Sequence, residues 1–235
     1  MPLIFFFFLL PACSSILYTD KSYIPTEEYT TVILEGFKVN ISPEALAYKQ
    51  KILEKLSEEF RFIRSNIPKE RLALISSTLI WVELNAKEKG FAEYHPSLRW
   101  LKENGYNPDK HKGIEVSNVG NYLTWSSNNI TPHPMVHELA HVLYHVLSAK
   151  EKIVINKAYT LSLASERYQS VYRLSKKIYE DGWALEDEWE YFSELSVAYF
   201  SINDYFPHTR KQLRKYDNDG YKMVESIWLT DEPKR

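Results

Sequence analysis

The sequence contains a single cysteine, Cys13, among its 235 residues. An internal disulfide is therefore excluded, and a structural zinc site, which is usually rich in cysteine, is disfavoured. An excess of charge is also lacking, because 29 Lys and Arg residues nearly balance 31 Asp and Glu residues, and there is no long basic run. This balance gives no indication of nucleic-acid binding. With 44% hydrophobic residues and no internal repeat, the chain is expected to fold as one globular domain.

A continuous apolar run occurs at the start of the chain, in residues 1–12 (MPLIFFFFLLPA). A run of about ten apolar residues is too short for a permanent membrane-spanning helix but is typical of a signal peptide. Its end, from Leu10 to Cys13, resembles the bacterial lipobox, in which the chain is cut before a cysteine that is then lipidated. We therefore expect a lipoprotein-type signal peptide, a membrane anchor on Cys13, and a place in the bacterial cell envelope facing the periplasm or the exterior. Ordinary secretion is the alternative.

Residues 13–35 show no clear period and are expected to form a tether, which leaves residues 36–235 as a single domain. Periodicity and turn signals predict strands over residues 37–41, 78–84, 113–118 and 122–125, and helices over residues 42–68, 96–104, 134–147, about 166–180, 187–200, 208–215 and 219–228. A small mixed sheet followed by a helical C-terminal half is an α+β fold.

The segment HELAH, residues 137–141, lies within one of the predicted helices. Because a helix turns ~100° per residue, His137 and His141 lie on one face and can bind the same ion. With Glu138 beside them, this is the H-E-x-x-H arrangement that holds a catalytic Zn²⁺ next to a general base. His145 continues the spacing but lies ~12 Å from His137 along the axis, so we expect it to be a packing residue. The other histidines are also expected to be surface or packing residues: His95, His111, His133 and His208.

A catalytic zinc ion normally has three protein ligands and one position open to water, so a third ligand is needed. The positions at which metzincins carry a glycine and a third histidine hold Tyr144 and Leu147 here. A later helix, residues 188–200, offers Glu190 and Glu194 on one face among aromatic side chains. Buried carboxylates are costly unless a cation compensates their charge, whereas a solvated acidic face is the alternative.

Several blocks of the sequence resemble a known family over roughly residues 94–228. These blocks are HELAH, EYFSE at 190–194, NDYFP at 203–207, YDNDGY at 216–221 before Trp228, and YHPSLRWLKENGYNPDK at 94–110. They look like those of the secreted zinc metallopeptidases, gluzincin-type zincins, that are related to the catalytic domain of anthrax lethal factor and to Pro-Pro endopeptidases. The resemblance implies a zincin-like fold with one Zn²⁺ per chain. It further implies that Glu190 binds the zinc and that Glu194 orients a ligating histidine.

The sequence departs from this family at one position. The family usually has a tyrosine seven residues before the ligating glutamate, whose hydroxyl stabilises the oxyanion, and this chain has Trp183 there. An indole N–H can donate a hydrogen bond but cannot act as an acid near neutral pH. Either a nearby tyrosine such as Tyr179 takes over this role or catalysis is weaker.

The sequence therefore predicts a monomeric zinc metallopeptidase, most simply an endopeptidase, acting on a peptide or protein substrate. The expected ligands are His137, His141 and Glu190, and Glu138 is the expected general base. In zincins an extended substrate pairs with the edge strand before the active helix, so residues 113–125 are expected to form the wall of the cleft. Two alternatives remain open: a lipid-anchored zinc-binding or peptide-binding protein with an impaired site, to which Trp183 points, and a purely structural metal.

Overall fold

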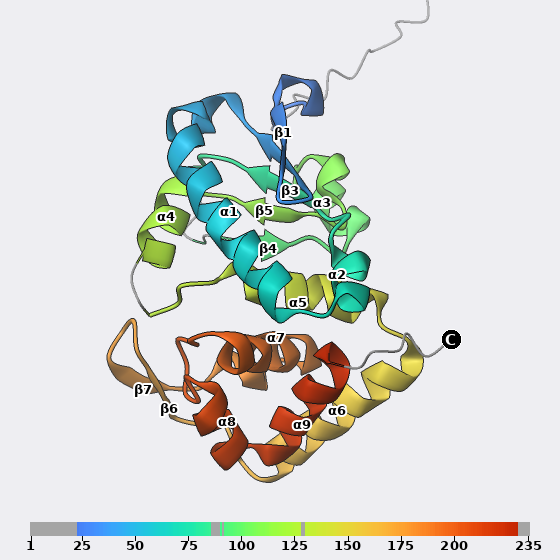
Figure 1. Ribbon diagram of the computed structural model, residues 1–235, viewed down its shortest axis with the longest axis vertical. Helices are drawn as coiled ribbons and strands as arrows, with labels where there is room; N and C mark the ends of the chain where they lie inside the picture. Colours follow the sequence, from blue (N-terminus) through green and yellow to red (C-terminus); the bar gives the residue numbers. More distant parts are fainter. Residues whose placement is uncertain (1–22, 86–89, 91, 128–129, 230–235) are drawn as a thin grey trace, which may run out of the picture.

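The computed structural model describes residues 23–85, 90, 92–127 and 130–229, and the N-terminal part is built on a mixed sheet (Figure 1). Its strands are β1 (Thr30–Leu34), β2 (Phe37–Ile41), β3 (Leu79–Val82), β4 (Glu93–Tyr94) and β5 (Ile114–Val116). Their order is β1-β2-β3-β5-β4. The three central strands run parallel, whereas β1 and β4 are antiparallel to their neighbours and form the two edges.

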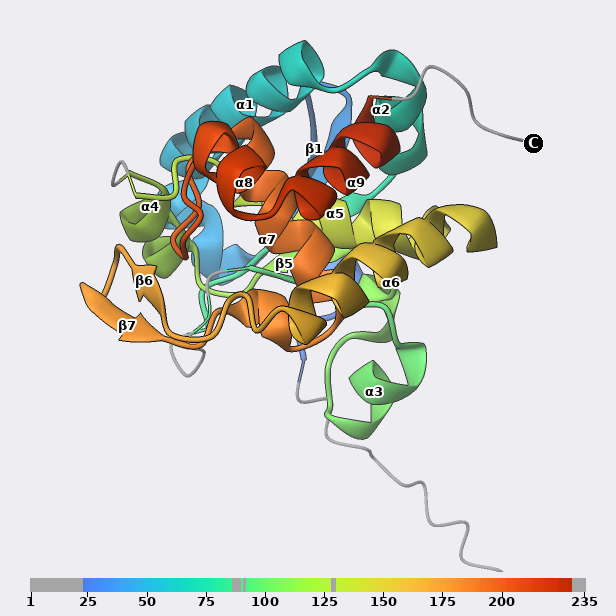
Figure 2. The same ribbon diagram turned by 90° about the horizontal axis from the view of Figure 1, so that it is seen from below.

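Helices cover the sheet and make up the C-terminal part of the molecule. The α-helices are α1 (Lys49–Asn66), α2 (Lys69–Ile75), α3 (Leu98–Glu103), α4 (Val119–Ser127), α5 (Met135–Val146), α6 (Ala149–Ala164), α7 (Glu188–Phe200), α8 (Arg210–Tyr216) and α9 (Asn218–Trp228). The 3-10 helices are η1 (Thr26–Glu28), η2 (Pro43–Tyr48), η3 (Pro108–Lys110) and η4 (Trp183–Leu185). A hairpin of β6 (Val171–Arg173) and β7 (Ile178–Glu180) lies at the opposite end of the helical part from the start of α6 (Figure 2). In the described part of the chain, no helix is both long and apolar enough to cross a membrane.

Apolar side chains join the sheet to α1. Phe37 of β2 is fully buried and stacks on Phe60 of α1, with ring centroids 4.2 Å apart. Ile52, Leu56 and Ile63 lie on the same face of the helix, because they recur at the helical spacing, and they are also fully buried. Burying a large apolar side chain stabilises a fold by about 1.5–3 kcal/mol, so this face fixes α1 on the sheet.

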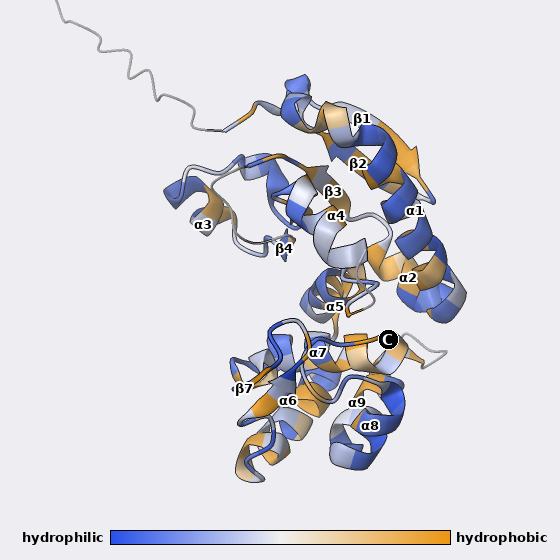
Figure 3. Ribbon diagram, turned by 90° about the vertical axis from the view of Figure 1, so that its left-hand side faces the viewer, coloured by the Kyte–Doolittle hydropathy of each residue, from blue (hydrophilic) through white to orange (hydrophobic). Residues whose placement is uncertain are grey.

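The helix α5 lies between the sheet and the C-terminal helices (Figure 3). It contacts α2 and β4 on the side of the sheet, and it packs closely against α7 on the other side. Most side chains of α5 from Met135 to Tyr144 are therefore buried, and His137 is half-buried. The apolar residues of this helix therefore pack in the interior, although it also carries three histidines and a glutamate. The two histidines of HELAH are thus carried by a largely enclosed helix.

The predicted α+β organisation is confirmed at this level: a small mixed sheet is followed by a helical part. The strands β2, β3 and β5 and the helices α3, α5, α7, α8 and α9 lie within about two residues of their predicted bounds. The helix predicted over residues 42–68 is divided into η2 and α1.

The strand predicted over residues 122–125 is wrong, because these residues belong to α4. Asn118 precedes this helix, and its side-chain oxygen accepts a hydrogen bond from the N–H of Asn121 at 3.0 Å. This cap favours a helix over the strand preference of the aromatic and β-branched residues that follow. The cap at Asn118, which lies outside the predicted strand, therefore outweighs the strand preference of residues 122–125.

The helix predicted over about residues 166–180 is also wrong, because this segment forms turns and the β6–β7 hairpin. A right-handed helix cannot contain residues with positive φ. Four occur here: Glu166, Tyr168, Ser170 and Lys177. The preceding helix, α6, was not predicted, since its apolar residues form no single stripe, but it begins with a capping box between Ser148 and Glu151.

Part of the expected tether belongs to the sheet. Residues 30–34 form β1, which pairs with β2 through a tight turn at Glu35 and Gly36, both with positive φ. The folded part of the chain therefore begins before residue 36. The expected signal peptide, residues 1–12, and the expected lipidation site, Cys13, lie outside the described residues.

Candidate metal centre

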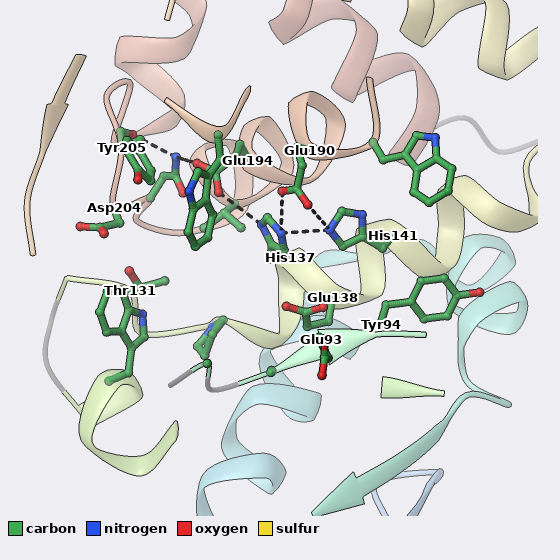
Figure 4. Close-up of a pocket in the computed structure, with 18 of the residues that line it drawn as sticks. Glu93, Tyr94, Thr131, His137, Glu138, His141, Glu190, Glu194, Asp204 and Tyr205 are labelled. Atoms are coloured by element: carbon green, nitrogen blue, oxygen red, sulfur yellow. Dashed lines mark hydrogen bonds and ion pairs between the residues drawn. The ribbon is translucent and has the colours of Figure 1, made fainter. Parts of the chain in front are cut away.

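Two packed helices bring the candidate ligands together. His137 and His141 project from α5 towards Glu190 on α7 (Figure 4). The two Nε2 atoms of the histidines are 3.0 Å apart. Nε2 of His137 lies 3.2 Å from Oε2 of Glu190, and Nε2 of His141 lies 3.3 Å from Oε1 of the same carboxylate. These three side chains could therefore hold one metal ion.

The electrostatics of this group favour a bound cation. Burial raises the pKa of Glu190, but the adjacent His137 and His141 side chains hold it well below its usual value. Burial lowers the pKa of His137, but the adjacent carboxylates of Glu190 and Glu194 raise it well above its usual value. Oε2 of Glu190 is nevertheless buried without a hydrogen bond to any described residue. A buried acceptor without a hydrogen bond is costly, and a positive ion at this point would satisfy it.

The other ring nitrogens of the two histidines are also engaged. Nδ1 of His137 lies 3.3 Å from Oε1 of Glu194, whose Oε2 accepts a hydrogen bond from Nδ2 of Asn203 at 2.9 Å. Nδ1 of His141 lies 3.1 Å from Oγ of Ser193. These partners fix the orientations of the two imidazole rings, so both Nε2 atoms face the carboxylate of Glu190. The expected orienting role of Glu194 is consistent with this arrangement.

Sequence reasoning did not single out Ser193 or Asn203. Ser193 is the fourth residue of the EYFSE block and lies three residues after Glu190 on α7, so helical spacing could have placed it on the same face. Asn203 is the first residue of NDYFP, in the loop after α7, and nothing in its spacing indicates that it reaches Glu194. Loop residues of this kind are identified only from the folded chain.

Glu138 lies beside the candidate ligands without belonging to them. Its side chain lines the same pocket and is turned towards Glu93 of β4 (Figure 4). Only 5% of Glu138 is exposed. Burial raises its pKa above the usual value, although His137 and His141 act in the opposite direction. A carboxylate with a raised pKa is the stronger base and therefore suits proton transfer near neutral pH.

The pocket around these residues has a volume of about 400 Å³ and a mainly apolar lining. Its aromatic walls are Tyr94, Trp125, Trp183, Trp189 and Tyr205. β4 borders it, and the outer edge of β4 pairs with no strand in the described ranges. The expectation that residues 113–125 form the cleft wall is therefore wrong, since β5 lies inside the sheet and, of that segment, Trp125 lines the pocket.

The two residues considered for oxyanion stabilisation lie in different places. Trp183, in η4, lines the pocket, and its ring centroid is 6.5 Å from that of His137. Tyr179, on β7, is 70% exposed and does not line the pocket. The structure therefore does not bring Tyr179 to the site. Tyr205, unlike Tyr179, lines the pocket, and its ring is 5.6 Å from that of Trp183. Its hydroxyl, however, donates to Glu180 and accepts from Arg173.

The remaining histidines lie apart from the candidate ligands. His145 contacts the ring of Tyr94, and His133 stacks on Phe62, so both are packing residues as expected. His95 is buried and lies with Glu93 and Glu115 in a second group of potential ligands. Nζ of Lys110 is only 2.7 Å from Glu115, however, so this group already contains its cation.

Comparison of the chain with protein-family models, with curated proteins and with solved structures found no match. The functional argument therefore depends on the residues of the pocket themselves. Function is more securely inferred from the chemistry of a site than from a fold in any case.

Proposed function

We propose that the protein is a zinc metallopeptidase with a zincin-like fold, in which His137, His141 and Glu190 bind one Zn²⁺. The main support is the close approach of the ligand atoms: the two Nε2 atoms are 3.0 Å apart, and they lie 3.2 and 3.3 Å from the two oxygens of the Glu190 carboxylate. Atoms bound to a tetrahedral ion at ~2.0–2.1 Å lie about 3.3 Å from one another. Two imidazoles and one carboxylate also leave a fourth position for a water or a substrate, as in catalytic zinc sites.

The residues around the ion each have a defined task in this proposal. When bound, the zinc would polarise the scissile carbonyl group and lower the pKa of water towards ~7. Glu138 removes the proton of the attacking water and passes it to the leaving amine. Glu194 and Ser193 keep the two histidine rings in position, and Asn203 keeps Glu194 in position.

The substrate in this proposal is a peptide segment in an extended conformation. The outer edge of β4, which pairs with no strand in the described ranges, lies alongside the pocket that contains Glu138, and such a segment could add to the sheet there. The aromatic walls of the pocket then contact the substrate side chains. An endopeptidase fits this arrangement best, because the segment can enter and leave along the strand. The protein is proposed to be a monomer, held at the bacterial cell envelope by a lipid on Cys13 or else secreted.

One observation favours a second function. Trp183 stands where the family that the sequence resembles usually has a tyrosine, and Tyr179 does not line the pocket and so does not replace it. A protein that binds zinc and peptides without cleaving them would share every other feature of the site. This alternative is a lipid-anchored binding protein, and peptide cleavage distinguishes it from the peptidase.

The first experiment measures the metal content of the purified protein and of Glu190→Ala. We expect about one zinc per wild-type chain and its loss or strong weakening in the variant, because the third ligand is removed. Glu188→Ala is the matched control, since Glu188 lies on the same helix turn but bonds Tyr144 rather than the histidines. Absence of zinc from the well-folded wild type would refute the metal site. Zinc binding without cleavage of any peptide in a library would favour the binding protein.

A further inference from the structure

The indole of Trp183 lies close to both the candidate metal centre and a buried arginine. Its ring lies 6.5 Å from the ring of His137. Cζ of Arg173 lies 5.4 Å from its centroid, and the ring of Tyr205 is 5.6 Å away. Trp183 is still 38% exposed, so its remaining surface is open to a substrate. The orientation of the indole in the pocket therefore depends on its contacts with Arg173 and Tyr205.

Arg173 is itself fixed by several hydrogen bonds. Its Nε donates to Oδ2 of Asp204 at 2.7 Å. Its Nη1 donates to Oε1 of Glu180 at 2.8 Å and to the hydroxyl of Tyr205 at 2.7 Å. The side chain is 9% exposed and also lies over the ring of Tyr205, at 4.6 Å. These partners come from β7 and from the loop after α7, so the guanidinium is a rigid support.

A guanidinium next to an indole does more than fill space. A cation over the face of an aromatic ring attracts it by ~0.5–2 kcal/mol and restricts its position. The positive charge also draws electron density from the ring, which strengthens its N–H as a donor in a pocket of low dielectric. Arg173 remains charged there, because its hydrogen bonds to Glu180 and Asp204 raise its pKa despite burial.

Peptide hydrolysis needs a donor that faces the carbonyl oxygen, since negative charge develops on that atom. The hydroxyl of Tyr205 is occupied by Arg173 and Glu180. The hydroxyl of Tyr94 points away from His137 and Glu190 (Figure 4). The indole N–H of Trp183 donates to no described residue and is not among the buried unpaired atoms. Trp183 is therefore a ring donor in the pocket, close to His137, whose N–H no described residue occupies.

We propose that Arg173 is a positioning residue, which holds the Trp183 indole so that its N–H donates to the carbonyl oxygen of the bound peptide. This inference rests on the proposed peptidase function. It explains how a tryptophan can replace the tyrosine while the site keeps a hydrogen-bond donor. The positive charge of Arg173 fixes the indole and strengthens its N–H as a donor. The hairpin that carries Arg173 thereby becomes part of the active site.

The first test does not depend on activity. The indole N–H signals of the full chain are recorded by NMR with ¹⁵N-labelled tryptophan, and Trp183 is assigned from their change in Trp183→Phe. We expect the Trp183 signal to shift or broaden in Arg173→Met, because the indole loses its support. Arg210→Met is the matched control, since Arg210 stacks on Tyr199 outside the pocket. An unchanged Trp183 signal in a folded Arg173→Met protein would overturn the proposal.

The second test uses a peptide that the zinc-loaded wild type cleaves. Trp183→Phe should lower kcat about 100-fold with little change in KM, as expected for one oxyanion donor. Arg173→Met should lower kcat by about 3- to 30-fold, in the range of a cation–π contact. The double variant should be no slower than Trp183→Phe alone, because the arginine acts through the tryptophan. If the kcat losses of the two single variants multiply in the double variant, Arg173 acts independently of Trp183, and the proposal is wrong.

Arg173→Lys covers the case in which the methionine variant does not fold. It keeps the positive charge but loses the planar group that lies along the ring, so it should recover part of kcat. If Arg173 has only a structural role, both variants will unfold more easily while kcat per zinc-loaded chain stays at the wild-type value, and the proposal fails. If the zinc-loaded wild type cleaves no peptide, the proposed function fails, and the NMR experiment still decides whether Arg173 positions Trp183.

Discussion

Glu59 on α1 accepts a hydrogen bond from the backbone N–H of Met135, the first residue of α5, at 2.9 Å. The residue before α5, Pro134, provides no side-chain cap. Glu59 is fully buried and also accepts a hydrogen bond from the hydroxyl of Tyr122 at 2.7 Å. A carboxylate at this point interacts favourably with the positive end of the helix dipole. The helix that carries both candidate histidines is therefore capped by a residue from a distant part of the chain.

Glu59 is expected to make stability depend on pH. Burial raises its pKa to about 7, from 4.5, so the folded protein holds the proton more tightly than the unfolded chain does. The contribution of this group is thus full below pH ~4.5 and falls as the pH rises to ~7, by ~2 kcal/mol between pH 5 and pH 8. Glu59→Gln should remove this dependence, as measured by urea unfolding at the two pH values.

The exposed neighbour Glu58 supplies the control for that experiment. Its side chain is 59% exposed and pairs with Lys55, so Glu58→Gln should leave the difference between pH 5 and pH 8 unchanged. An equal difference in wild type and in Glu59→Gln would show that the buried carboxylate does not titrate in this range.

Glu138→Gln is expected to separate metal binding from catalysis. The amide keeps the shape of the side chain but cannot accept the proton of water, so cleavage should fall by about 10²- to 10⁴-fold while the zinc content stays at the wild-type level. The measurements are the metal content and the initial rate on one cleaved peptide. A variant as active as the wild type would exclude Glu138 as the general base.

Ser193→Ala is expected to weaken zinc binding about 10-fold, because Nδ1 of His141 loses the partner that orients the ring. Ser196, three residues later on α7, is a matched control, since its hydroxyl donates to the carbonyl of Phe192 and accepts from Nε1 of Trp228. Ser196→Ala should therefore lower the free energy of unfolding by about 1–3 kcal/mol without changing zinc affinity. Competition with a chelator gives the affinities, and equal affinities in the two variants would contradict the orienting role.

Two glycine substitutions are expected to have opposite effects on stability. A Cβ at Gly220 in α9 would lie 2.5 Å from the hydroxyl of Tyr191 and 2.7 Å from Asp217, so Gly220→Ala should destabilise the fold by about 1–3 kcal/mol. A Cβ at Gly120 in α4 would lie 3.4 Å from Asn118, an ordinary contact, and the alanine should stabilise the helix by about 0.5–1 kcal/mol. Thermal unfolding of both variants tests this, and equal melting temperatures would show that α9 does not pack as described.

The sequence predicted the parts of the site that depend on local spacing. His137 and His141 share a face because of helix geometry alone, and Glu190 and Glu194 follow the same rule on α7. Apolar periodicity likewise located β2, β3, α5 and α7. These features need no knowledge of how distant segments meet, which is why they could be predicted.

The parts that were missed depend on contacts between distant segments. Tyr179 is near Trp183 in sequence, yet the hairpin turns it to solvent, whereas Tyr205 reaches the pocket from beyond α7. The burial of Arg173 is favourable only because Asp204 and Glu180 meet it in the folded chain. The hairpin itself depends on residues with positive φ that are not glycine, and tertiary contacts decide such positions.

The proposed zinc ligands lie on opposite sides of the boundary between the two parts of the molecule. α5 rests against the sheet, whereas α7 belongs to the C-terminal helices, and Glu190 follows His141 only after α6 and the β6–β7 hairpin. A bound ion would thus cross-link α5 and α7 and close the long loop of chain between them. Its free energy of binding would be added to that of folding, so removing the metal would make the helical part the first to open and the first to be digested by other proteases.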